Sequence, residues 1–137
     1  MRKIGLDIGK VRIGVAHSDT MGIIATSTEV FTRKFLKADV SYVVRLAKDK
    51  EADTIVVGLP LKMDGTEGQS VQMVNDFVEE LKRQTDIKVV LQDERLSTVS
   101  AQRILIDSNV RRDKRKDVID KVAATIILQT YLDSPKK

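Results

Sequence analysis

Hydrophobic and polar residues alternate along the first third of the chain. Over residues 3–9, the isoleucines and the leucine fall on one face, and the intervening positions are polar or glycine. A period of two is typical of a β-strand. Residues 12–18 repeat the pattern, and the short link between the two segments suits a hairpin. We expect a third strand over residues 23–31.

After this region, apolar residues recur at helical spacing, interrupted by short apolar runs. Continuous apolarity in such a run indicates a strand that is buried on both faces. Ser70 is placed to cap one of the helices. We expect strands over residues 53–58 and 87–91, and helices over residues 37–50, 70–83, about 98–107 and 117–133.

This order of elements predicts one α/β domain spanning residues 1–137. Its mixed sheet should be antiparallel at the start and parallel afterwards, with helices covering it. The 137 residues suit a single domain, and the 42% of hydrophobic residues are enough for a real core.

Composition excludes several kinds of chemistry. The chain has no cysteine, so it has no disulfide, thiolate metal site or cysteine nucleophile. Its one histidine, His17, is interpreted as a partly buried residue of the second strand. No apolar run approaches the length of a membrane span, and the N-terminus does not resemble a signal peptide. We therefore expect a soluble, cytoplasmic protein with no membrane partner.

Positive charge is concentrated in one stretch, residues 111–116, which we call the basic segment. The net charge is +4, and five of these six residues are cationic. A charge run is usually a solvated loop, but beside a cluster of acids it could bind a polyanion. Aromatic residues make up only 4%, which argues against a platform that stacks bases. The candidate phosphate-binding residues are Arg111, Arg112, Lys114, Arg115 and Lys116, with Lys10 and Arg12 near the first strand.

Asp7 is the most informative acid, because aspartate is depleted in strands and this one lies in the middle of the first. Gly5 and Gly9 share its face, so we expect an open notch that suits a cation ligand. The alternative is a structural aspartate that accepts hydrogen bonds from backbone amides.

Two other pairs of acids lie where elements begin or end. Asp93 and Glu94 follow a parallel strand, and sites form at the carboxyl ends of such strands. Asp117 and Asp120 open the last expected helix, three residues apart and so on one face. Each pair has a structural alternative, as an exposed turn or as helix capping.

A single chemistry accounts for all three places. Carboxylates from two strand ends and a helix start could converge on one or two Mg²⁺ ions, which prefer oxygen ligands. Two such ions can activate water and stabilise the leaving oxygen in phosphodiester hydrolysis.

Four stretches of the chain resemble the YqgF/RuvX family of the RNase H-like and Holliday-junction-resolvase superfamily. They span nearly the whole chain in the family's order, and jointly they are highly specific. They are Gly5–Gly9 with Arg12–Ala16 and Ser18–Asp19; Val57–Pro60 with Asp64–Thr66 and Gly68; Asp93–Thr98; and Lys116–Ala124 with Ile127–Gln129 and Tyr131–Asp133.

The resemblance implies an RNase H-like fold, a five-stranded mixed sheet with helices on both faces. It implies a nuclease that depends on Mg²⁺ or Mn²⁺ and acts on structured nucleic acid, with Asp7, Glu94 and Asp120 as catalytic carboxylates. Asp117 matches the paired aspartates of resolvases, although the YqgF pattern does not demand an acid there. Arg95 belongs to the same set of motifs and joins the candidate nucleic-acid contacts.

The family is associated with trimming the 5′ end of the pre-16S rRNA during ribosome biogenesis, which implies RNA or ribosomal particles as partners. Three alternatives stay open at this stage. One is a resolvase that cuts branched DNA, and another is an RNA- or ribosome-binding factor that does not cleave. The third is a phosphotransferase of the actin or sugar-kinase type, which would need a second domain. The sequence does not determine the oligomeric state.

Overall fold

The computed structural model describes residues 1–59, 69–93 and 112–134. Five strands form one sheet in the order β3-β2-β1-β4-β5. The first three are joined by antiparallel pairing, and β4 and β5 add in parallel to β1. The predicted mixed sheet is therefore confirmed. The strands are β1 (Arg2–Ile8), β2 (Arg12–Ser18), β3 (Ala25–Thr32), β4 (Ala52–Leu59) and β5 (Lys88–Asp93).

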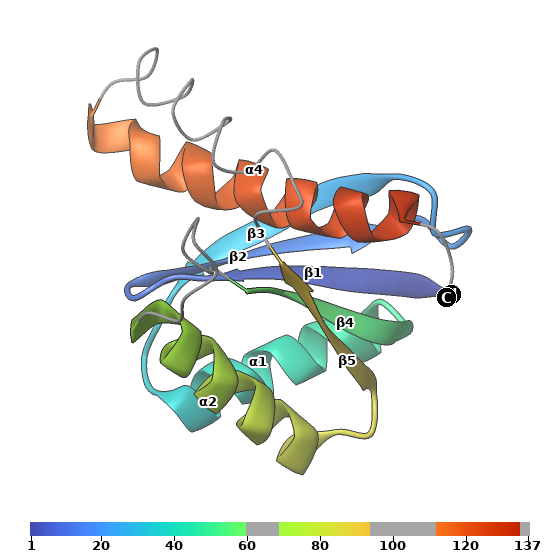
Figure 1. The fold of residues 1–137 in the computed structure, drawn as a ribbon, viewed down its shortest axis with the longest axis horizontal. Helices are drawn as coiled ribbons and strands as arrows, with labels where there is room; N and C mark the ends of the chain where they lie inside the picture. Colours follow the sequence, from blue (N-terminus) through green and yellow to red (C-terminus); the bar gives the residue numbers. More distant parts are fainter. Residues whose placement is uncertain (60–68, 94–111, 135–137) are drawn as a thin grey trace.

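Helices cover both faces of this sheet, as predicted (Figure 1). One face packs against α1 (Leu36–Asp49) and α2 (Gln69–Gln84), and the other against α4 (Arg112–Asp133). The apolar residues that recur at helical spacing in α1 and α2 are buried, with Val40 and Phe77 fully enclosed. No helix in the described part of the chain is long and apolar enough to span a membrane.

Strand β4 is buried on both faces, as its continuous apolarity predicted. Ile55 and Val57 belong to the core under α1 and α2, whereas Val56 belongs to the smaller core under α4. The same expectation for the last strand was wrong. Because β5 is an edge strand with a partner on one side only, Leu91 is 42% exposed.

Several element boundaries differ from those expected. The third strand begins at Ala25 rather than at residue 23, and α2 begins at Gln69, so Ser70 lies in its first turn instead of capping it. The expected helix over residues 98–107 lies outside the described residues.

The largest difference concerns the last helix, which begins at Arg112 instead of Asp117. Four of the five cations of the basic segment are therefore helical and do not form a loop. Asp117 is the sixth residue of the helix, so it cannot be its N-cap. Lysine and arginine are good helix formers, but a run of charges has no apolar periodicity from which a helix could be predicted.

Gly5 is a point of close approach between the sheet and α4. A Cβ atom added there would lie 2.6 Å from Cβ of Leu128 and 3.1 Å from the carbonyl oxygen of Ala124. The expected notch beside Asp7 is thus filled by α4 on this side. At Gly9, an added Cβ would lie 2.7 Å from the Arg12 carbonyl oxygen, so the hairpin backbone fills the other side.

We predict that Gly5→Ala destabilises the protein by about 1–3 kcal/mol, because the new methyl group overpacks the contact with α4. Leu128→Gly in the same chain removes the Cβ atom that the new methyl group would meet. The double variant should therefore lose less stability than the sum of the two single variants, as measured by urea denaturation. Strict additivity would show that α4 does not press on β1 at this point.

Candidate active site

Asp7 lies one residue before the end of β1, and it is only 5% exposed. It shares a face of the strand with Gly5, so its side chain is on the side of the sheet that α4 covers. A carboxylate at this depth is costly unless it has hydrogen bonds or a cation beside it. The predicted site needs a buried acid at the carboxyl end of a central strand, and Asp7 occupies such a position.

A row of four residues crosses the sheet at the level of Asp7. Asp7 pairs with Gly14 of β2, and the β1–β4 register, continued by one residue, puts it level with Gly58. Gly58 pairs in turn with Gln92 of β5. Both positions flanking Asp7 in this row lack a side chain, so neighbouring strands do not crowd its carboxylate.

Helix α4 brings a second predicted residue to the same level. It runs antiparallel to β1, with Ala124 and Leu128 over Gly5 and Gln129 bonded to the backbone at Ile23 and Ala25 (Figure 1). Position 120 lies four helix residues before Ala124, which is about 6 Å along the helix axis. Asp7 lies two strand residues after Gly5, which is about 6.6 Å along the strand. Helix position 120 is therefore level with Asp7, whereas position 117 lies nearly a turn beyond it.

The other predicted residues are only partly described. Glu94, Arg95 and Arg111 lie outside the described residues, although β5 ends at Asp93, immediately before Glu94. Lys10 is exposed and Arg12 is partly buried in the β1–β2 hairpin. Arg112, Lys114, Arg115 and Lys116 occupy the first turns of α4. Among the described residues, no three acids or histidines lie close enough together to hold a metal ion, so the ligand set stays a prediction.

Asp39 is a second buried carboxylate, but its surroundings differ from those of a metal ligand. It is 3% exposed and accepts hydrogen bonds from Nε of Arg33 at 3.0 Å and from the backbone N–H of Lys34 at 2.9 Å. These donors compensate its burial within the protein. Asp39 therefore has a structural role.

Arg33 connects this ion pair to the β1–β2 hairpin, and sequence reasoning missed it. Its Nη1 donates to the Gly9 carbonyl oxygen at 3.2 Å, and its backbone N–H donates to the Val11 carbonyl oxygen at 2.8 Å. Its guanidinium lies 5.8 Å from the ring centroid of Phe77. Arg33 thus fixes the hairpin that follows Asp7. An isolated arginine between two predicted elements gave no signal of this role.

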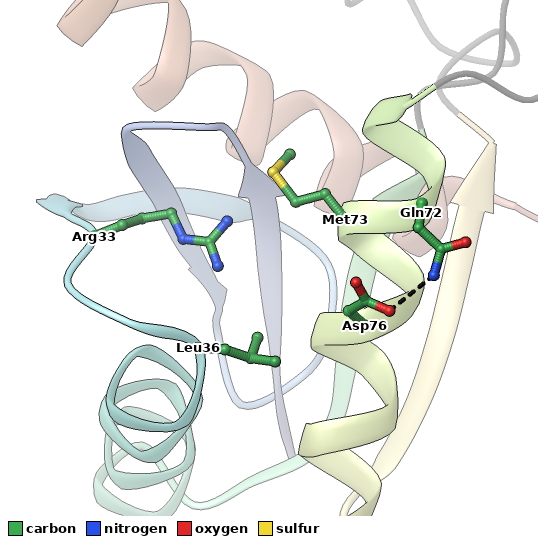
Figure 2. Close-up of a pocket in the computed structure, with 5 residues that line it drawn as sticks. All are labelled: Arg33, Leu36, Gln72, Met73 and Asp76. Carbon is green, nitrogen blue, oxygen red and sulfur yellow. Dashed lines mark hydrogen bonds between the residues drawn. The ribbon is translucent and has the colours of Figure 1, made fainter.

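An open pocket of about 410 Å³ lies beside Arg33, between α1 and α2 (Figure 2). It is lined by Arg33, Leu36, Gln72, Met73 and Asp76, and Gln72 donates a 2.8 Å hydrogen bond to Asp76. Leu36 and Met73 pack on the α1/α2 core, so the pocket is on the opposite face of the sheet from Asp7. It contains none of the predicted catalytic residues.

His17 is partly buried on β2, as predicted, and its Nδ1 is hydrogen-bonded to Oγ1 of Thr28. Burial lowers the pKa of His17, and the nearby charges of Lys50 and Arg2 lower it further. The ring is therefore neutral at pH 7. It lies far along the strand from the end that carries the site.

Two solved structures with a similar fold have names that mention Holliday junctions. Thermus thermophilus RuvC, in a complex with Holliday junction substrate, has a TM-score of 0.60 and 10% identity, and 96% of this chain and 94% of that chain are covered. The fowlpox virus Holliday junction resolvase has a TM-score of 0.54 and 16% identity, with 98% and 100% covered. At these identities the likeness concerns the fold alone, which is the RNase H-like fold that the sequence predicted.

Sequence comparison gives the family. The model described as "RuvX: Holliday junction resolvase" matches residues 1–134. Proteins named "Putative pre-16S rRNA nuclease" are 47% identical in Halothermothrix orenii, over 100% of this chain and 98% of theirs, and 48% identical in Thermoanaerobacter pseudethanolicus, over 99% of each. The chain therefore belongs to the RuvX family and is a nuclease, a hydrolase, as the resemblance implied.

We predict that Arg33→Met lowers the free energy of unfolding by about 3–5 kcal/mol, because it leaves Asp39 buried without its partner. Arg83→Met is the matched control, since Arg83 makes an exposed ion pair with Glu80, and it should cost less than about 1 kcal/mol. Urea denaturation of both variants measures the difference. Equal losses would contradict a structural role for the Arg33–Asp39 pair.

Proposed function

We propose that the protein is a metal-dependent endonuclease that processes the 5′ end of the pre-16S rRNA. The observation that carries the proposal is the buried carboxylate of Asp7 at the carboxyl end of a central strand, level with position 120 of α4. The relatives named for pre-16S rRNA match the chain over nearly its whole length, which supports this substrate.

We propose Asp7, Glu94 and Asp120 as ligands for one or two Mg²⁺ or Mn²⁺ ions, with Asp117 as a further candidate. The described part of this set fits a hard cation, because Asp7 is a buried oxygen donor flanked by glycines. Such ions, when bound, lower the pKa of a water molecule and stabilise the leaving oxygen. The protein's part is to hold its carboxylates together and to orient the phosphodiester.

The cations have a different task in this proposal. Lys10, Arg12 and Arg95, with the basic segment, would contact phosphates along the strand that enters the site. Contacts of this kind fix the register of a nucleic acid without reading its sequence. The proposed partners are structured RNA or ribosomal particles, which place the protein in the cytoplasm.

Branched DNA is the second candidate substrate, and the description of the matching family model as a Holliday junction resolvase favours it. The same carboxylates and cations would serve either substrate, because phosphodiester chemistry is common to RNA and DNA. Cleavage of a pre-16S 5′ leader RNA and of a four-way DNA junction should therefore be compared side by side.

We predict that Asp7→Asn reduces Mg²⁺- or Mn²⁺-dependent cleavage by at least 100-fold while the fold remains intact. The amide keeps the shape of the side chain but loses the charge that attracts the cation. Glu94→Gln and Asp120→Asn should behave alike. Cleavage of labelled leader RNA and junction DNA, followed on gels with and without chelator, measures the loss.

Thermal unfolding of the same variants separates a catalytic role from a structural one. Loss of a structural hydrogen bond costs about 0.5–1.5 kcal/mol and leaves turnover unchanged. Wild-type cleavage by Asp7→Asn would refute the assignment. Binding of leader RNA without cleavage by the wild-type protein would instead identify an RNA-binding factor.

We also predict that serine substitutions at the five cations of residues 111–116 weaken binding to all nucleic acids similarly. The slope of log Kd against log salt should become shallower by about 0.7–0.9 for each phosphate that the variant no longer binds. Turnover at saturating substrate should fall less than affinity, because the carboxylates are untouched. An unchanged affinity and salt slope would mean that the nucleic acid binds elsewhere.

A further inference from the structure

Gln92 is a buried polar residue whose side chain lacks a hydrogen-bond partner in the part of the chain that the structure describes. It is only 9% exposed, although it lies on the edge strand β5. Its carboxamide could donate two hydrogen bonds and accept two. Burial without these bonds is unfavourable, and such a group in a native protein calls for an explanation.

Other buried polar side chains in the described residues do have partners. Ser18 accepts a hydrogen bond from the backbone N–H of Lys3 at 2.8 Å and donates one to the Asp19 carbonyl oxygen at 2.9 Å. Thr54 donates to Asp53 at 3.1 Å, and Asp39 is bonded to Arg33 and to the backbone of Lys34. Gln92 therefore departs from the pattern of the rest of the core.

The position of Gln92 connects it with the candidate active site. It lies in the row that also contains Asp7 and Gly58, with Gly58 between the two. Val89 packs on the α1/α2 core, so strand alternation turns Gln92 to the opposite face, the one that Asp7 shares. Two strand spacings of about 4.8 Å put the Cα atoms of Asp7 and Gln92 about 10 Å apart. No side chain of β4 fills that interval, because Gly58 has none.

We propose that Gln92 is a substrate-binding residue whose carboxamide N–H donates a hydrogen bond to a non-bridging phosphate oxygen of the nucleic acid. This inference rests on the proposed nuclease function of the same site. A neutral donor suits a phosphate here, because it binds the anion without repelling the cation that Asp7 would hold. The missing partner of the buried amide is then the substrate itself.

Gln92→Met and Gln129→Met make a matched pair of variants for the test. Gln129 is bonded to the backbone at Ala25 and Ile23, at 2.8 and 2.9 Å, so its amide is structural. Gln92→Met should leave the melting temperature unchanged or raise it, and should lower kcat/KM for leader RNA by about tenfold or more, chiefly through KM. Gln129→Met should lower the melting temperature and should raise KM less than Gln92→Met does.

Gln92→Glu separates phosphate binding from cation binding. A carboxylate would repel a phosphate, so this variant should lose more activity than Gln92→Met. Activity equal to or above that of the wild type in Gln92→Glu would mean that the side-chain oxygen binds the cation, which overturns the proposal. Wild-type kinetics in Gln92→Met, or a large fall in its melting temperature, would overturn it as well.

The proposed function and this inference can fail separately. If wild-type protein cleaves neither substrate, or if Asp7→Asn cleaves normally, the proposed function fails. The inference is then judged by the anisotropy of fluorescent leader RNA with wild-type protein and Gln92→Met. A tenfold loss of affinity in the variant supports it, and equal affinity overturns it.

Discussion

The contact of α4 with β1 at Gly5 determines how the two halves of the candidate site meet. Asp7 belongs to a hairpin near the N-terminus, and residue 120 belongs to a helix more than 100 residues later. The packing of Ala124 and Leu128 on a residue without a side chain helps to bring them to the same level, together with the hydrogen bonds of Gln129 to the backbone at Ile23 and Ala25. A larger residue at position 5 would push the helix away from the sheet. Because a misplacement of about 1 Å can cost about 100-fold in rate, under the proposed function this contact would affect catalysis as well as stability.

Under the proposed function, the two buried carboxylates have different roles in one fold. Asp39 forms an ion pair with Arg33, which balances its charge within the protein, and it also accepts a hydrogen bond from a backbone amide. Asp7 lies on the other face, where its flanking sheet positions are glycine. Arg33 links the two regions, because it pairs with Asp39 and also holds the carbonyl oxygen of Gly9. The structural ion pair thus supports the hairpin that follows the proposed ligand.

Apolar periodicity was sufficient to predict most of the sheet and of its covering helices. It predicted β2 at its observed bounds and the buried positions of α1 and α2, because burial on one face leaves a regular trace in the sequence. It failed for β5, since an edge strand and a central strand can have similar composition. The sequence also misled at Gly5 and Gly9, where open space beside Asp7 was expected. A glycine can indicate close packing as readily as open space, and only the structure distinguishes the two.

The early start of α4 changes how the cations can act on a nucleic acid. From Arg112 to Ala123, the first buried residue of the helix in the described part, is about 16 Å along the axis. These turns extend past the end of the sheet, at the edge where β1 and β5 end (Figure 1). A loop would have to lose conformational entropy when it bound a phosphate backbone, whereas a helix has already lost most of it. Cations on a helix can therefore contribute more of their electrostatic energy to binding, and the helix dipole adds positive charge at the same end. Under the proposed function, this arrangement would concentrate positive potential beside the carboxylates and attract a polyanion to a place where two or more acids would otherwise repel it.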